Sequence, residues 1–140
     1  MTRHLLLVGG DAPVSGVCRE FLKALHGDDY EVETIEHCDD ALALLLRRPF
    51  DVVLLLSLRA PWRAWPSSES LARLTSETGM LFLSKMRALH SDVPVIVVSA
   101  ASWLMDRVLA NGAFAFVDIP PDLRELDRAV ADALGPSRDK

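Results

Sequence analysis

The sequence predicts a doubly wound α/β fold, in which a parallel β-sheet is covered by helices on both faces. Short apolar runs and longer helical patterns alternate along the chain, giving five strand and helix pairs in 140 residues. Parallel strands need such crossover connections, and right-handed crossovers place helices on both faces of the sheet. The apolar runs at 51–58 and 93–99 are apolar on both strand faces, which is typical of buried central strands.

The first half of the chain contains three of the predicted strands and two of the helices. They are a strand at 4–8, a helix at 13–25, a strand at 30–35, a helix ending at Arg48 and a strand at 51–58. In the first helix, apolar residues recur every three or four positions, the spacing of an amphipathic helix. Asp39 or Asp40 is positioned to cap the second helix, and Pro49 stops it.

The second half contains three helices and two strands. They are a helix at 71–89, a strand at 93–99, a helix at 102–109, a strand at 114–119 and a helix at 123–134. Ligands of such sheets bind at the carboxyl ends of the strands. Four loops therefore carry the candidate functional residues, and they are 9–11, the segment from 57 onward, 99–102 and 118–121.

The composition argues against nucleic acid as a partner and favours a reducing cellular compartment. A formal net charge of −5 argues against a broad phosphate-neutralising surface, and hence against direct nucleic-acid binding. Cys18 and Cys38 lack metal-ligand spacing and are expected to be buried thiols of a reducing compartment. The longest apolar run, at 52–58, is too short to span a bilayer. We expect a cytoplasmic protein without a membrane anchor, with one domain at 1–135 and a flexible tail at 136–140.

Four stretches carry a family resemblance: HLLLVGGD, FDVVLLLSLRAP, DVPVIVVSA and NGAFAFVDIPPDLREL. In these stretches the sequence resembles the receiver domain of two-component response regulators, over nearly the whole chain. The resemblance implies a flavodoxin-like five-stranded sheet. It also implies the family's chemistry, a Mg²⁺-dependent phosphoryl transfer from a histidine kinase to an aspartate at the end of the third strand.

The residues that hold Mg²⁺ and balance phosphoryl charge in the family are missing at the matching positions. The acidic pair falls on Gly9 and Gly10, with Asp11 beside them, and the lysine falls on Ile119. Mg²⁺ needs carboxylates, and transfer to aspartate needs the metal and the lysine. The resemblance thus implies a degenerate phosphorylation site with no metal and no cofactor. A weak cation site between Asp11 and Asp118 stays open beside the favoured interpretation, two solvated loop acids.

The phosphoacceptor position has two possible registers. It falls on Ser57 if Pro61 matches the family's loop proline, or on Leu56 if residues are counted from the start of the strand. Neither side chain forms an acyl phosphate. Two positions of the family's conformational switch do match, with Ser99 at the hydroxyl position and Phe116 at the aromatic position.

An inserted segment at about 61–78 contains Trp62, Arg63 and Trp65. It is roughly fourteen residues longer than the family needs, and long loops in compact domains are commonly functional or disordered. Tryptophan and arginine are enriched at interface hot spots. Two interpretations stay open: a partner site, or tryptophans that fold back over the depleted pocket. Trp103, at the start of the fourth helix, is a further partner-binding residue to test.

The sequence therefore predicts an atypical receiver domain of bacterial two-component-type signalling that acts as a phosphorylation-independent interaction module and is not an enzyme. The expected partner is a kinase, an output protein, another receiver, or a second copy bound through the fourth helix, fifth strand and fifth helix. The alternative is a small α/β domain that binds a ligand or nucleotide at the Gly9-Gly10 loop under the inserted segment. That loop matches neither GxGxxG nor GxxxxGK[ST].

Overall fold

The computed structural model describes residues 2–9, 12–58, 62, 78–90, 92–118 and 123–135. Its elements are β1 (Arg3–Val8), α1 (Ala12–His26), β2 (Tyr30–Ile35), α2 (Cys38–Arg47), β3 (Val52–Leu55), α3 (Thr78–Leu89), β4 (Val95–Ser99), α4 (Met105–Ala110), β5 (Ala115–Asp118) and α5 (Leu123–Leu134). Short 3-10 helices at Gly27–Asp29 and Ser102–Leu104 lead into β2 and α4.

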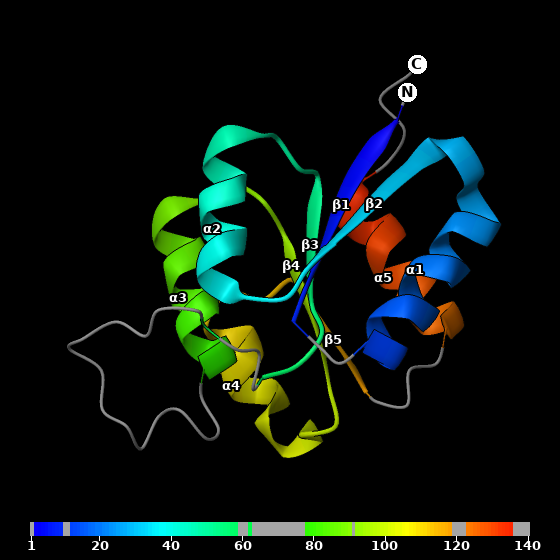
Figure 1. The fold of residues 1–140 in the computed structure, drawn as a ribbon. Coiled ribbons are helices and arrows are strands. Elements are labelled where there is room, and N and C mark those ends of the chain that lie inside the picture. Colours follow the sequence, from blue (N-terminus) through cyan, green and yellow to red (C-terminus); the bar gives the residue numbers. More distant parts are fainter. Residues whose placement is uncertain are drawn as a thin grey trace.

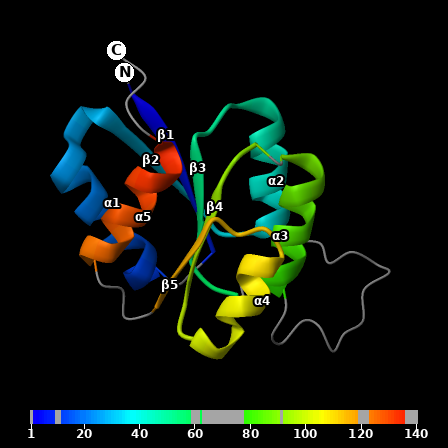
Figure 2. The same cartoon turned by 180° about the vertical axis from the view of Figure 1, so that it is seen from behind.

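The strands form one parallel sheet in the order β2-β1-β3-β4-β5. The chain first builds outward from β1 to β2 and then crosses to β3, β4 and β5, which is the strand order of flavodoxin-like folds. Figures 1 and 2 show α1 and α5 on one face of the sheet, and α2, α3 and α4 on the other. The predicted fold class is confirmed.

Side chains of the strands alternate between two apolar cores, one on each face of the sheet. The core under α2, α3 and α4 contains Leu6, Val8, Val53, Leu55, Val95 and Val97 of the strands and Cys38, Ala41, Leu45, Phe82, Leu83, Met86 and Val108 of the helices. The core under α1 and α5 contains Leu5, Leu7, Val52, Leu54, Ile96, Val98 and Val117 of the strands and Cys18, Leu22, Leu126 and Val130 of the helices. Burial on both faces explains why the central strands are almost wholly apolar.

Several predicted element boundaries differ from the structure. α2 begins at Cys38 with His37 as its N-cap residue, so the predicted N-cap at Asp39 or Asp40 is wrong. Both acids lie instead in the first turn, where a negative charge is favourable near the positive end of the helix dipole. β3 ends at Leu55, earlier than predicted. The part of the predicted third helix before residue 78 lies outside the described residues.

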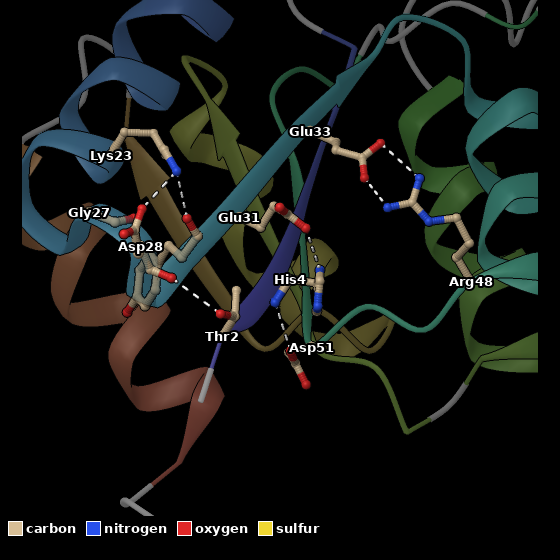
Figure 3. A network of polar contacts seen from close by, with 10 residues as sticks. Thr2, His4, Lys23, Gly27, Asp28, Glu31, Glu33, Arg48 and Asp51 are labelled. Atoms are coloured by element: carbon tan, nitrogen blue, oxygen red, sulfur yellow. Dashed lines mark hydrogen bonds and ion pairs between the residues drawn. The ribbon is translucent and has the colours of Figure 1, made fainter.

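Polar contacts tie the strands together at their amino ends (Figure 3). The His4 amide donates to Asp51 Oδ2 at 2.8 Å, and the Asp51 amide donates to the His4 carbonyl at 2.7 Å. Asp51 therefore fixes the start of β3 against β1. The side chain of His4 contacts Glu31 on β2 at 3.3 Å, and Arg48 forms an ion pair with Glu33. In the part of the chain that the structure describes, no helix is long and apolar enough to cross a membrane.

Candidate functional site at the carboxyl edge of the sheet

Four of the residues singled out in the sequence lie along one edge of the sheet. Ser99 pairs with Asp118 between β4 and β5, while Gly9 and Ser57 follow the ends of β1 and β3. The parallel strands thus bring these four positions to the same edge, which is where ligands of such sheets bind. Five other predicted residues lie outside the described residues; they are Gly10, Asp11, Arg63, Trp65 and Ile119.

Gly9 turns the chain at the end of β1 and is already hydrogen-bonded there. Its φ is +72°, a left-handed conformation that glycine adopts without steric cost. Its amide donates to the Ile35 carbonyl at 2.9 Å, which closes the end of the β1 and β2 pair. This amide is therefore used by the sheet and is not a donor for a phosphate, which counts against a nucleotide cradle at this position.

Leu56 and Ser57 occupy different environments after β3. Leu56 is 1% exposed and packs in the core under α1 and α5, and its amide donates to the Val8 carbonyl at 2.9 Å. Ser57 is half-buried and follows it at the carboxyl edge. Successive side chains of an extended segment point to opposite faces. Of the two candidate residues, Leu56 is thus a core residue, and Ser57 is the one that is partly exposed.

Ser99 and Phe116, the two predicted switch positions, each have defined contacts. Ser99 is buried, and its hydroxyl oxygen accepts a hydrogen bond from the Ala101 amide at 3.0 Å. Such a bond closes a local turn. Phe116 is half-buried and packs against the core under α2, α3 and α4. The hydroxyl is thus held by its own loop and the ring by the core.

The described residues supply neither a metal cluster nor a reactive thiol. No group of three or more His, Cys, Asp or Glu side chains among them is arranged to hold a metal ion. Asp118 is exposed at the carboxyl edge, and Asp11, its suggested partner, lies outside the described residues. Both cysteines are buried and unoxidised, as predicted. Burial raises the pKa of Cys38 to about 12 and also raises the pKa of Cys18, so neither is a thiolate near neutral pH.

Comparison with solved structures identifies the fold family. A CheY-like response regulator receiver domain protein from Methanospirillum hungatei is 23% identical, with a TM-score of 0.74 over 96% of this chain and 94% of that one. The non-phosphorylated HemR receiver domain from Leptospira biflexa is 22% identical, with a TM-score of 0.70 over 99% of both chains. NtrX from Brucella abortus, in complex with ADP, is 20% identical, with a TM-score of 0.73. The match covers 96% of this chain but only 26% of that NtrX chain.

The chain has the receiver fold. The predicted likeness to response regulator receiver domains is thereby confirmed at the level of structure. No protein-family model matches the sequence, and no curated protein matches it either.

In this receiver fold, Trp62 and Trp103 differ sharply in exposure. Trp62 is half-buried and packs against the core under α2, α3 and α4. Trp65, the other tryptophan of the inserted segment, lies outside the described residues. Trp103 lies on the 3-10 helix before α4 and is 79% exposed. Of the two, Trp103 is the exposed side chain.

Four exposed apolar side chains follow one another along the chain from the 3-10 helix through α4 to the residue before β5, and we call them the α4 patch: Trp103, Met105, Leu109 and Phe114. Trp103 lies on the 3-10 helix after β4, Met105 and Leu109 lie on α4, and Phe114 lies just before β5. The sequence prediction included Trp103 alone. The sequence did indicate exposure of Met105 and Leu109. Apolar residues occupy more positions of 103–109 than one buried helix stripe can use, so some of them must be exposed. In α4, only Val108 is fully buried.

Proposed function

We propose that this chain is an atypical receiver domain of two-component-type signalling that binds a protein partner without aspartyl phosphorylation. The observation that carries the proposal is the chemistry of the carboxyl edge, where Gly9 and Ser57 stand in place of acids. An acyl phosphate forms only on a carboxylate, and Mg²⁺ needs several oxygen ligands, usually including carboxylates. In this proposal the domain catalyses no reaction and works in the cytoplasm.

A fixed conformation follows from the same proposal. A ligand shifts a two-state equilibrium only through contacts that differ between the states. A domain that receives no phosphoryl group has no such contact at its carboxyl edge. Ser99 is held by the Ala101 amide and Phe116 by the core, so the surface of α4, β5 and α5 is presented continuously.

The α4 patch supports protein binding as the mode of action. Several large exposed apolar side chains in one segment are a feature of interaction sites on soluble domains, and tryptophan is prominent among hot-spot residues. The proposed partner is a signalling protein, whether a kinase, an output protein, another receiver or a second copy of this chain. Arg63 and Trp65 of the inserted segment are proposed as additional partner contacts, with residues 61–78 as an insertion in a receiver unit spanning 1–135.

Replacing Trp103 tests this proposal. We expect Trp103→Ala to weaken partner binding by about thirtyfold, because truncation of a central tryptophan removes about 2 kcal/mol of binding energy. The control is Leu46→Ala, since Leu46 on α2 is also exposed, at 70%, but lies on another helix. The measurement is affinity capture from an extract of the native cells, quantified by mass spectrometry, with and without Mg²⁺ and acetyl phosphate.

We expect to find a protein that the wild type and Leu46→Ala retain and that Trp103→Ala loses. Acetyl phosphate should not change the amount retained. Retention that requires acetyl phosphate contradicts phosphorylation-independent binding. Equal retention by the wild type and by Trp103→Ala contradicts the α4 patch as the binding surface.

A further inference from the structure

The strand β2 is an edge of the sheet, and its sequence suits strand pairing. It pairs with β1 alone, and its six residues, YEVETI, make it longer than β5, the strand at the opposite edge. Tyrosine, valine, threonine and isoleucine all favour extended structure. A free edge of this kind exposes backbone groups that a strand of another molecule can pair with.

The direction of each peptide group in β2 follows from one hydrogen bond. The Ile35 carbonyl accepts a hydrogen bond from the amide of Gly9, the residue after β1. The N–H and C=O groups of Ile35 therefore point toward β1. Peptide groups alternate in direction along a strand. The carbonyls of Tyr30, Val32 and Thr34 therefore point outward, away from the sheet.

Two of these outward carbonyls are occupied by basic side chains of α1. Lys23 Nζ donates to the Tyr30 carbonyl at 2.9 Å, and Arg19 Nε donates to the Val32 carbonyl at 3.4 Å. Lys23 also donates to the Gly27 carbonyl at 3.3 Å, and Figure 3 shows it reaching from α1 to the start of β2.

The spacing of these two contacts matches the geometry of the two elements. Arg19 and Lys23 are four residues apart, which is about 6 Å along a helix and places both on one side of it. Tyr30 and Val32 are two residues apart, which is about 6.6 Å along a strand. A pair of cations at i and i+4 on α1 can therefore cover consecutive outward carbonyls of β2.

We propose that Arg19 and Lys23 cap the outer edge of β2 and keep this chain from pairing edge to edge with a second copy of itself. The occupant of an uncapped edge is the β2 strand of another copy. Antiparallel pairing of two identical edges about a two-fold axis is self-complementary, so one strand supplies both halves of the interface. The proposal concerns the opposite end of the sheet from the α4 patch and does not rest on the proposed function.

The test removes both cations in a Trp103→Ala background, so that association through the α4 patch does not contribute. We expect Arg19→Ala/Lys23→Ala to self-associate at least about tenfold more tightly than the background protein. The control is Arg47→Ala/Lys85→Ala, which removes the same charge from exposed positions on α2 and α3. Sedimentation equilibrium measures the association, and circular dichroism verifies that each variant is folded.

Amide hydrogen exchange locates the interface. In the dimer of the double variant, the outward amides of Val32 and Thr34 should become protected as the protein concentration rises. Adding Thr34→Pro, which removes one outward amide, should restore the monomer. A double variant that stays as monomeric as its control overturns the proposal. So does a dimer in which exchange at Val32 and Thr34 is unchanged.

Discussion

Leu56→Asp is expected to unfold the protein under conditions in which Ser57→Asp remains folded. Leu56 is 1% exposed in the core under α1 and α5, so an aspartate there is buried among apolar side chains. Such burial costs at least about 4 kcal/mol, comparable with the whole stability of a small domain. Ser57 lies at the carboxyl edge with access to water, and its replacement should cost less than about 2 kcal/mol.

Urea unfolding followed by circular dichroism measures both variants. Leu56→Asn is the matched control for charge, because it has nearly the shape of aspartate and no ionised group; it should be less destabilising than Leu56→Asp. Equal stability of Leu56→Asp and Ser57→Asp would show that residue 56 reaches solvent.

Gly79→Ala is expected to destabilise the protein by about 3 kcal/mol, the upper part of the range for an overpacked core. A Cβ at residue 79 would lie 2.7 Å from the Leu58 Cα and 2.9 Å from the Leu58 carbonyl oxygen. Both are backbone atoms, and the Gly79 amide donates to that same carbonyl at 2.8 Å. The start of α3 therefore cannot accept a side chain without moving away from the segment after β3.

Gly16→Ala is the matched control, because Gly16 also lies in a helix and a Cβ there would meet nothing within 4 Å. Alanine has the higher helix propensity, so this variant should gain about 0.5–1 kcal/mol. Thermal unfolding measures both changes. A Gly79→Ala protein as stable as the wild type would show that α3 does not dock tightly on Leu58.

The central strands and the last helix could be predicted from the sequence because local pattern and tertiary environment agree there. The helix α5 has the predicted bounds, Leu123–Leu134, since its apolar positions recur on one face and only that face is buried. In contrast, the run LLLSL after Val53 is apolar past the end of β3. Periodicity alone could not show that Leu56 is buried and that Ser57 reaches the edge.

Other features depend on contacts between distant segments, which a sequence pattern does not contain. The cap expected of Asp39 or Asp40 failed because the helix begins earlier, at Cys38, whose side chain is buried, and His37 is the N-cap residue. Gly79 is an ordinary helical glycine in sequence, and its role comes from Leu58, twenty-one positions earlier. Similarly, Arg19 and Lys23 look like solvent-facing helix residues until the edge of β2 is placed beside them.

The central claim is that this receiver fold does not bind a phosphoryl group at its carboxyl edge. The most direct test is an amide ¹H–¹⁵N spectrum recorded while Mg²⁺ and beryllofluoride are added, with a receiver domain that has the acidic pair and the aspartate as positive control. We predict no saturable shift at Ser57, Ser99 or Phe116, while the control protein shifts fully. Saturable shifts centred on Ser57 and Ser99, with exchange of Phe116 between two conformations, would contradict the account and indicate a working switch.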